Sequence, residues 1–321
     1  MKTIGVLTSG GDSPGMNAAV RAVVRTGLEN DMRVLGIYNG YEGLMSGDIA
    51  EMNLRTMSNV IQRGGTVLRT ARSEEFKTER GRAKAAATCE RFGIEGLVVV
   101  GGDGSFRGMQ KLSQQEGIVC VGLPGTIDND ISCTEFTIGF DTAVNTVMHM
   151  VDQVRDTTES HSRCSVIEVM GRKAGYIALE AGIAVGATSI LIPEFEYDFE
   201  LDVVERMKYT ISTGKQHFII IVAEGCGDAT DMAKRIQAAT GVESRATILG
   251  HVQRGGSPTV RDRVLASRMG NYAVHLLRDG FESRVVAVQA EQIVDYDIDE
   301  ALSMEKSIDI DLYRMAHEIS I

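Results

Sequence analysis

Two aspartates separated by one residue follow a short turn near the middle of the chain. Asp128 and Asp130 belong to the run LPGTIDND (residues 123–130), directly after the apolar stretch 117–122. Such a stretch predicts a buried strand, and residues past its carboxyl end face the ligand crevice of an open α/β sheet. Two carboxylates in a crevice can divide the work: one accepts a proton, while the other holds a metal or tunes its neighbour. Asp-Asn-Asp is also ordinary turn chemistry, so the other motifs decide the interpretation.

Three glycine-rich loops also follow predicted strands: TSGGDSPGMN (8–17), GGDGS (101–105) and GRKAG (171–175). A strand, a glycine loop and a helix together point backbone N–H groups at an anion. The first loop is not a Walker A motif, because it lacks the final Gly-Lys-Ser/Thr. The second loop does not match a dinucleotide-binding fingerprint, because Arg107 stands where the third glycine should be. What remains is Gly102, Asp103 and Gly104, which combine room for a phosphate with one carboxylate that could carry Mg²⁺.

Several arginines stand in loops beside predicted strands: Arg72, Arg163, Arg172, Arg245 and Arg254. Because arginine binds phosphate bidentately and stays charged, loop arginines in an acidic protein predict an anion site. His251, within GHVQRGG (250–256), could position a hydroxyl or phosphate, and Glu224 after the strand 218–223 could bond sugar hydroxyls. The remaining arginines considered are interpreted as solvated surface charge: Arg80, Arg82, Arg91 and Arg107.

The composition is that of a globular protein, with 321 residues, 43% hydrophobic and 24% charged, enough for one large or two medium domains. A net charge of -11 argues against nucleic acid as the main partner but leaves room for an anionic substrate. Five scattered cysteines predict neither a disulfide framework nor a zinc site, and Cys120 and Cys164 are predicted to be buried. We expect no signal peptide, no membrane span and a reducing cytoplasm.

Apolar runs alternate with amphipathic stretches, which predicts a mostly parallel sheet with helices on both faces. The predicted strands are 3–7, 33–37, 96–100, 118–122, 165–170, 189–192, 218–223 and 284–289. Apolar residues at helical spacing predict one stripe from Val144 to Val154 and another from Val264 to Leu276. Two α/β layers of similar size are expected, with a break near residues 139–141.

Five of these motifs, in order, resemble the bacterial ATP-dependent 6-phosphofructokinase family: residues 8–12, 101–105, 124–130, 170–172 and 250–256. The resemblance covers essentially the whole chain. It implies two similar three-layer α/β domains with mostly parallel sheets and an active site in the cleft between them. The larger, ATP-binding domain would comprise 1–139 plus 252–303, and the smaller, fructose-6-phosphate-binding domain 140–251 plus 304–321.

The resemblance implies phosphoryl transfer from Mg-ATP to the 1-hydroxyl of D-fructose 6-phosphate, the committed step of glycolysis. Asp128 would be the general base, Asp103 would help to hold Mg²⁺, and Thr126, Arg72 and Arg172 would support the transferring group. The residues implied for ATP are Gly11, Tyr41, Arg72, Phe76, Lys77, Gly102, Asp103, Gly104 and Ser105. Those implied for the sugar phosphate are Thr126, Asp128, Asp130, Arg163, Met170, Gly171, Arg172, Glu224, Arg245, His251 and Arg254.

In this family Arg163 and Arg245 match arginines that reach the 6-phosphate from a neighbouring subunit, so the resemblance implies a homotetramer with shared active sites. Gly104 and Gly125 stand where the pyrophosphate-dependent branch carries Asp and Lys, which favours ATP as donor. A pyrophosphate-dependent enzyme remains the alternative, as does a non-catalytic nucleotide and sugar-phosphate sensor. An NAD-binding oxidoreductase ranks third.

The resemblance also implies an effector site between subunits, to which Arg21, Arg25, Arg155 and Lys215 correspond. Thr188 stands where allosteric relatives carry a Glu that engages the effector's metal, and Thr213 where they carry a cation. Leu54 stands where relatives carry an arginine that the partner subunit supplies, and Arg55 follows it one residue late. Tyr176 stands where many relatives carry an Asp after the glycine. These departures lead to the hypothesis that effector control is weakened or altered.

Overall fold

The structure, a computed structural model, describes residues 1–320 and divides the chain into two units. Unit 1 comprises Met1–Thr142 and Arg254–Lys306, and unit 2 comprises Ala143–Gln253 and the C-terminal segment from Ser307. The predicted domain ends at 139, 251 and 303 lie within three residues of these divisions. Residue 321, the last of the predicted smaller domain, lies outside the described residues.

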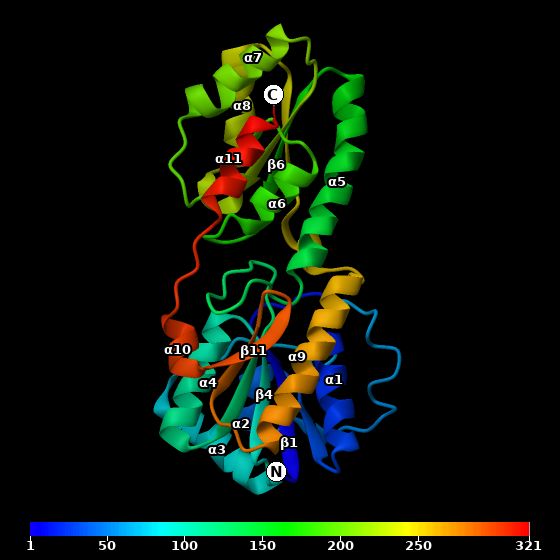
Figure 1. Ribbon diagram of the computed structural model, residues 1–321, viewed down its shortest axis with the longest axis vertical. Coiled ribbons are helices and arrows are strands. Elements are labelled where there is room, and N and C mark those ends of the chain that lie inside the picture. Colours follow the sequence, from blue (N-terminus) through cyan, green and yellow to red (C-terminus); the bar gives the residue numbers. More distant parts are fainter. Residues whose placement is uncertain (321) are drawn as a thin grey trace. The chain divides into compact units, whose positions relative to one another are not determined.

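Unit 1 is built on a seven-stranded sheet in the order β11-β10-β5-β4-β1-β2-β3 (Figure 1). The strands are β1 (Thr3–Ser9), β2 (Arg33–Ile37), β3 (Ile49–Glu51), β4 (Gly96–Gly101), β5 (Val119–Pro124), β10 (Arg284–Gln289) and β11 (Gln292–Asp297). Five strands are parallel, and β3 and β11 pair antiparallel at the two edges. The sheet is therefore mostly parallel, as the alternation of apolar runs and helical stretches predicts.

Strand β4 shows why unit 1 has three layers. Val98 and Val100 enter an apolar cluster with α1 (Met16–Glu29) and α9 (Val260–Arg278). Leu97 and Val99 point to the opposite face, where helices α2, α3, α4 and α10 lie. Their bounds are α2 (Gly40–Ser46), α3 (Glu79–Phe92), α4 (Asp103–Glu116) and α10 (Ile298–Ser303). A strand covered on both faces must be apolar at every position, which is the pattern of this run.

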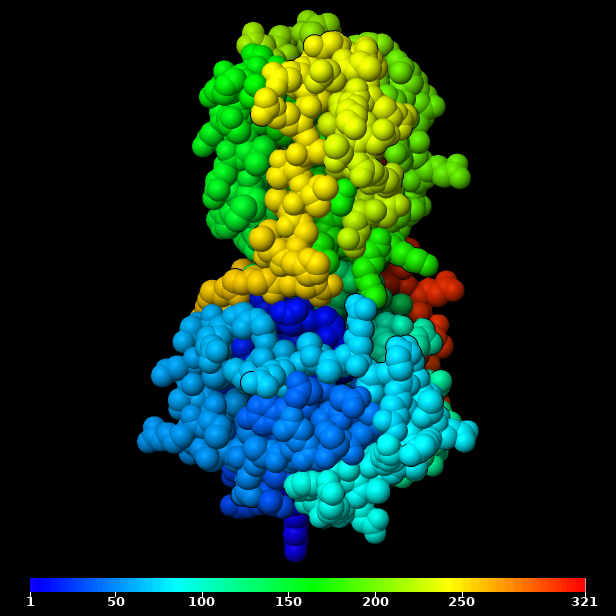
Figure 2. All heavy atoms as spheres, turned by 180° about the vertical axis from the view of Figure 1, so that it is seen from behind, coloured from blue at the N-terminus to red at the C-terminus, as the bar shows by residue number. Residues whose placement is uncertain are grey.

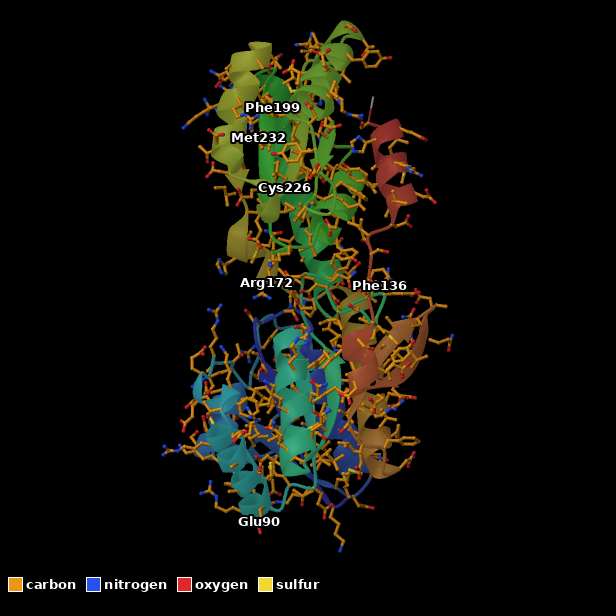
Figure 3. The ribbon with its side chains drawn as sticks, turned by 90° about the vertical axis from the view of Figure 1, so that its left-hand side faces the viewer. Glu90, Phe136, Arg172, Phe199, Cys226 and Met232 are labelled. Atoms are coloured by element: carbon orange, nitrogen blue, oxygen red, sulfur yellow. The ribbon has the colours of Figure 1, made fainter. Side chains whose placement is uncertain are left out.

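Unit 2 is built on a four-stranded parallel sheet in the order β7-β8-β6-β9. The strands are β6 (Cys164–Val169), β7 (Ser189–Leu191), β8 (Phe218–Ala223) and β9 (Ser244–Ile248). The remaining helices are α5 (Phe140–Ser160), α6 (Tyr176–Ala184), α7 (Arg206–Ser212), α8 (Ala229–Thr240) and α11 (Ile310–Glu318). Met232 of α8 packs into a core with β6 and β8, which Phe199 and Cys226 border (Figure 3). Helix α6 packs against β7 and β8, and α11 packs against α6.

Three expectations about the elements are wrong. The two sheets have seven and four strands, so the units are not of similar size. Val264, predicted to lie on the buried stripe of α9, is 52% exposed, because the buried face of this helix follows Leu265 and Met269 instead. Arg82, predicted to be a surface charge, is buried in α3, where its guanidinium bonds Gln115 and the carbonyl of Lys77.

The prediction that Cys120 and Cys164 are buried is confirmed. All five cysteines are free, and four of them are buried. Burial raises the pKa of Cys164 to about 12, so this thiol stays protonated as a small apolar side chain. None of the helices in residues 1–320 combines the length and the apolar composition needed to cross a bilayer.

Candidate active site

Three of the predicted loops meet at the carboxyl edge of the unit 1 sheet. Strands β1, β4 and β5 are parallel neighbours, so the loops that follow them share one edge. The Ser105 hydroxyl donates a hydrogen bond to Ser9 Oγ at 2.9 Å, and the Gly125 N–H donates to the Gly101 carbonyl at 2.9 Å. The structure thus brings the loop 8–17 together with the loops 101–105 and 124–130, which follow it by more than 80 residues in the sequence.

Asp128 lies in a turn whose backbone is held from several sides. Its side chain is nearly buried, with 3% of the residue exposed, and its N–H donates to Thr126 Oγ1 at 3.2 Å. Asn129 has a left-handed backbone (φ 53°), and its amide bridges to the segment 135–137. The Thr137 hydroxyl donates to the Thr126 carbonyl at 2.6 Å. These contacts hold the backbone that carries Asp128, and a general base must be positioned close to the proton that it takes.

Asp103 and Asp130 line one cavity of about 110 Å³ within unit 1, together with Arg107, Ser132 and Met304. Asp103 is the first residue of α4, and its carboxylate pairs with Arg107 Nε at 2.8 Å, which raises the pKa of Arg107. Among residues 1–320 no group of three or more His, Cys, Asp or Glu side chains could hold a metal ion. Mg²⁺ is usually bound by one or two carboxylates plus substrate phosphates, so this donor set fits a magnesium ion that arrives with a phosphate ligand.

Arg254 reaches the first glycine loop. Its Nη1 donates to the carbonyl of Asp12 at 3.1 Å, and the guanidinium lies over Gly11. A Cβ atom at Gly11 would come within 2.5 Å of Arg254 Nη1, so only glycine leaves this loop open to the arginine. Gly11 and Arg254, which the resemblance assigns to the nucleotide and to the sugar phosphate, are therefore neighbours in unit 1.

The two glycines that favoured ATP differ in their surroundings. A Cβ at Gly104 would meet no heavy atom within 4 Å, so this position borders open space. A Cβ at Gly125 would meet Val100 Cγ1 at 3.0 Å and Met16 Cε at 3.2 Å. Gly125 therefore faces the protein interior and does not itself leave room for a nucleotide, which corrects the expectation for that residue.

The aromatic residues expected near adenosine lie in the core of unit 1. The rings of Tyr41 and Phe76 are buried and stacked at a centroid distance of 3.9 Å, and the Tyr41 hydroxyl donates to the Ser105 carbonyl. The two rings stack on each other in the core, and the Tyr41 hydroxyl helps to hold the loop 101–105 in place. Lys77 and Arg72 are exposed, and Lys77 pairs with Glu74 at 2.7 Å. Parts of the chain around them, drawn in light blue, lie on the face shown in Figure 2.

Most of the unit 2 residues that the resemblance assigns to the sugar phosphate follow the carboxyl ends of β6, β8 and β9, whereas Arg163 and Arg245 lie at the amino-terminal ends of β6 and β9. Gly171 and Arg172 both have positive φ, and the Arg172 N–H donates to Glu224 Oε1 at 2.6 Å (Arg172 is labelled in Figure 3). Gln253 is fully buried and accepts from the Met170 N–H at 3.2 Å. His251 is exposed. Sequence reasoning missed Gln253, although it stands inside the GHVQRGG motif.

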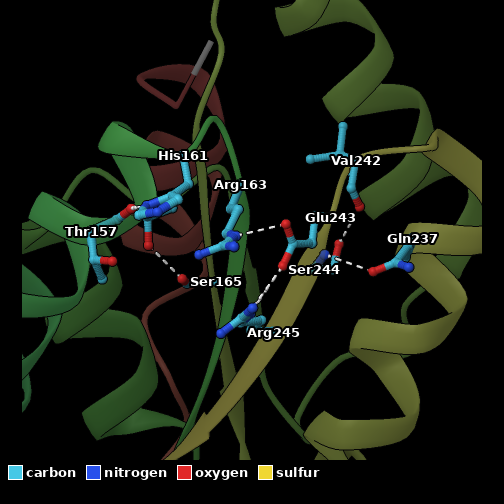
Figure 4. Close-up of polar contacts among 10 residues, drawn as sticks. Thr157, His161, Arg163, Ser165, Gln237, Val242, Glu243, Ser244 and Arg245 are labelled. Atoms are coloured by element: carbon cyan, nitrogen blue, oxygen red, sulfur yellow. Dashed lines mark hydrogen bonds and ion pairs between the residues drawn. The ribbon is translucent and has the colours of Figure 1, made fainter.

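Arg163 and Arg245 share one carboxylate, that of Glu243 (Figure 4). Arg163 Nε lies 2.9 Å from Glu243 Oε2, and Arg245 Nη2 lies 2.9 Å from Oε1. Hydrogen bonds from Arg163 and then Arg245 lower the pKa of Glu243. The parallel pairing of β6 with β9 aligns Ser165 with Arg245, which brings the two arginines to one place. Sequence reasoning missed Glu243, whose only signal is its spacing of two from Arg245.

The residues matched to an effector site fall on both units. Arg21 and Arg25 lie one turn apart on α1, and burial together with Arg25 lowers the pKa of Arg21. In unit 2 the ammonium of Lys215 donates to Thr188 Oγ1 at 3.1 Å. Burial, with nearby Arg155 and Arg206, lowers the pKa of Lys215.

Arg206 is a cation that sequence reasoning did not include. Its Nε lies 3.3 Å from the Thr188 carbonyl, and its Nη2 donates to the carbonyl of His317 at 2.8 Å. Two cations of unit 2, Lys215 and Arg206, therefore bond Thr188.

Comparisons with known proteins agree with the arrangement of these motifs. The phosphofructokinase family matches residues 3–277. An ATP-dependent 6-phosphofructokinase of Clostridium botulinum is 57% identical over 320 residues, and one of Clostridium tetani is 57% identical over 324 residues; each match covers 100% of both chains. The structure is similar to phosphofructokinase from Saccharomyces cerevisiae (TM-score 0.91, 37% identity), covering 100% of this chain and 48% of the yeast chain, which is about twice as long. The chain therefore belongs to the phosphofructokinase family.

Proposed function

We propose that this chain transfers the γ-phosphoryl group of ATP to the 1-hydroxyl of D-fructose 6-phosphate, giving fructose 1,6-bisphosphate and ADP in glycolysis. The observation that carries the proposal is the meeting of the Asp128 turn with the loops 8–17 and 101–105 at one sheet edge. The full-length identity of 57% to enzymes named ATP-dependent 6-phosphofructokinase supports it.

In the proposed reaction Asp128 takes the proton of the 1-hydroxyl as that oxygen attacks the γ-phosphorus. Phosphoryl transfer depends on positioning and on neutralising charge more than on covalent chemistry. Thr126, Arg72 and Arg172 would support the transferring group, and the backbone at Gly11 would lie close to the phosphates. The hydrogen bonds that hold the turn of Asp128 support its role, because a base must be fixed within reach of the proton.

Mg²⁺ is proposed as the cofactor, with Asp103 as its protein ligand. When bound, it would neutralise charge on the phosphates. The carboxylate of Asp103 borders a cavity that Asp130 also lines, and oxygen donors of this kind suit a hard cation. The partner of Asp103 in the structure, Arg107, is exposed and can exchange Asp103 for solvent at little cost.

The sugar phosphate is proposed to bind through Met170, Gly171, Arg172, Glu224 and His251, with Arg254 of unit 1. Arg163 and Arg245 are proposed to reach the 6-phosphate bound to a neighbouring subunit of a homotetramer, so that each active site is shared. A reducing cytoplasm is the proposed location, which the five free cysteines support.

A coupled assay of fructose 1,6-bisphosphate formation tests the proposal, with Mg-ATP and with Mg-pyrophosphate offered in parallel. Turnover with ATP alone is the expected outcome, since Gly104 borders open space. Turnover with pyrophosphate would favour the pyrophosphate-dependent alternative. Silence with both donors from a folded protein would favour a different acceptor, or the non-catalytic sensor, which binding of ATP and fructose 6-phosphate by calorimetry would then reveal.

A further inference from the structure

Lys306, the last residue of unit 1 in the sequence, contacts the turn that carries Asp128. The ammonium of Lys306 donates to the carbonyl of Asn129 at 2.8 Å and lies 3.3 Å from the carbonyl of Glu135. Asn129 stands between Asp128 and Asp130, and its left-handed backbone (φ 53°) sets the direction in which the chain leaves Asp128. Lys306 therefore bonds the main chain between the two carboxylates.

The other contacts of this turn act on different atoms. The Asn129 side chain accepts from the Thr137 N–H at 3.1 Å and donates to the Glu135 carbonyl at 3.1 Å. Among the contacts in the described residues, Lys306 is the one that holds the Asn129 carbonyl, and so the peptide plane between Asn129 and Asp130. A charged donor makes a stronger hydrogen bond than a neutral one, and Lys306 is partly buried where it acts.

The segment around Lys306 also borders the cavity that Asp103 and Asp130 line. Met304, two residues before Lys306, is one of the residues lining that cavity. Lys306 is the last residue of unit 1, and the chain continues into unit 2 at Ser307. The ammonium thus reaches the turn from a segment that is far from Asp128 in the sequence and follows α10 directly.

We propose that Lys306 is a positioning residue for phosphoryl transfer: by holding the Asn129 carbonyl it orients Asp128 toward the hydroxyl that is phosphorylated. This role rests on the proposed function, in which Asp128 is the base. Lys306 acts through the turn and not by touching substrate. Its loss therefore leaves the glycine loops and the arginines proposed to bind the two substrates in place while the turn of Asp128 shifts, and a misplacement of about 1 Å costs up to 10²-fold in rate.

The test compares K306M, K306R and the matched control K234M, which removes an exposed lysine of α8 in unit 2. Methionine keeps the length of the stem without its donors, and arginine keeps both the charge and N–H donors. For K306M we expect a kcat about 10-fold lower with both KM values within about 3-fold of wild type. K306R should recover most of this loss, and K234M should match wild type.

Several outcomes would overturn the proposal: a K306M kcat within about twofold of wild type, equal losses in K306R and K306M, or a rise in KM with kcat unchanged. Melting temperatures show whether each variant is folded; if K306M is not, K306Q, which keeps an N–H donor without the charge, takes its place. Wild-type turnover of fructose 6-phosphate with ATP is measured first. A silent wild type would refute the proposed function, whereas an active wild type with a fully active K306M would refute only the role of Lys306.

Discussion

At the scale of single residues, the position of Asp128 is set by the backbone of its own turn. Replacing Asp128 by Ser keeps a small polar side chain in that turn but removes the base. We expect kcat to fall by about 10²- to 10⁴-fold, the usual contribution of a general base, with both KM values little changed. Steady-state kinetics with D152S, an exposed aspartate of α5, as control checks this. A kcat within a few fold of wild type would remove Asp128 from the role of base.

Gly104 and Gly125 provide a second test, because their surroundings differ. Gly104→Ala adds a methyl group to space that no protein atom occupies, so we expect unchanged folding and a higher KM for ATP. Gly125→Ala must displace Val100 and Met16, which costs about 1–3 kcal/mol of stability, the range for overpacking. Melting temperatures and KM values for ATP separate the two effects. The opposite pattern, with a raised KM only in G125A, would return Gly125 to the nucleotide site.

At the scale of elements, the sequence predicts the apolar strands, the edge strand β7 among them, and misses three edge strands of mixed polarity. The bounds of β2, β8 and β10 agree with the predicted strands because the residues between their ends are buried and apolar or small. The strands β3, β9 and β11 lie at sheet edges, and their mixed polar sequences carry no such run.

The candidate site follows the same division. Motifs that end a central strand could be placed at one sheet edge from the pattern alone, as with the loop 101–105 and the turn of Asp128. The contacts that hold them could not be predicted. Lys306 and Glu243 have ordinary sequence surroundings, and Gln253 stands in a motif whose histidine and arginine drew the interpretation. Only the folded chain brings these three residues to their partners. Tyr41 and Phe76 show the converse, since the core uses the rings that the resemblance placed beside a ligand.

Two helix starts in unit 1 are joined by one buried carboxylate, that of Asp262 in α9. It accepts from the N–H groups of Gly139 and Thr142 at 2.8 Å each, and also from the Thr142 hydroxyl, at the beginning of α5. Burial, opposed by these bonds and helped by Asp141, raises the pKa of Asp262 to about 6. Asp262→Asn should lower the stability by about 1–3 kcal/mol. Both oxygens of Asp262 accept hydrogen bonds, and in the variant an NH₂ group would replace one of these acceptors and face another donor.

The pH dependence of this cost has a definite sign. A carboxyl group with a raised folded pKa contributes stability that is complete below its unfolded value and is lost as pH rises through the folded value, here from about 4 to about 6. The advantage of wild type over D262N should therefore be about 1 kcal/mol greater at pH 5 than at pH 7.5. Urea unfolding at the two pH values measures it, and an advantage that grows toward pH 7.5 would contradict the raised pKa.

At the scale of the whole molecule, the surroundings of Thr188 bear on regulation. The Thr188 hydroxyl lies beside Lys215, and Arg206 bonds the Thr188 carbonyl, where the resemblance implies that allosteric relatives carry a carboxylate for a metal-bound effector. We expect weak responses to ADP and phosphoenolpyruvate, measured as changes in the saturation curve for fructose 6-phosphate. Strong sigmoidal inhibition by phosphoenolpyruvate, relieved by micromolar ADP, would show that the site works without that carboxylate.

The proposed sharing of active sites between subunits can be tested by mixing two inactive variants. In the proposed arrangement each active site uses Asp128 from one subunit and Arg163 from its neighbour. The variants D128N and R163A therefore each lose activity, but they lose different halves of the shared site. Co-refolded mixtures should then regain activity, because some sites combine an intact Asp128 with an intact Arg163. A mixture of D128N with R72A is the control and should stay inactive, since both side chains serve the same subunit's site. Recovery in neither mixture would place Arg163 in the active site of its own chain, where its pairing with Glu243 within unit 2 would have to open for the phosphate.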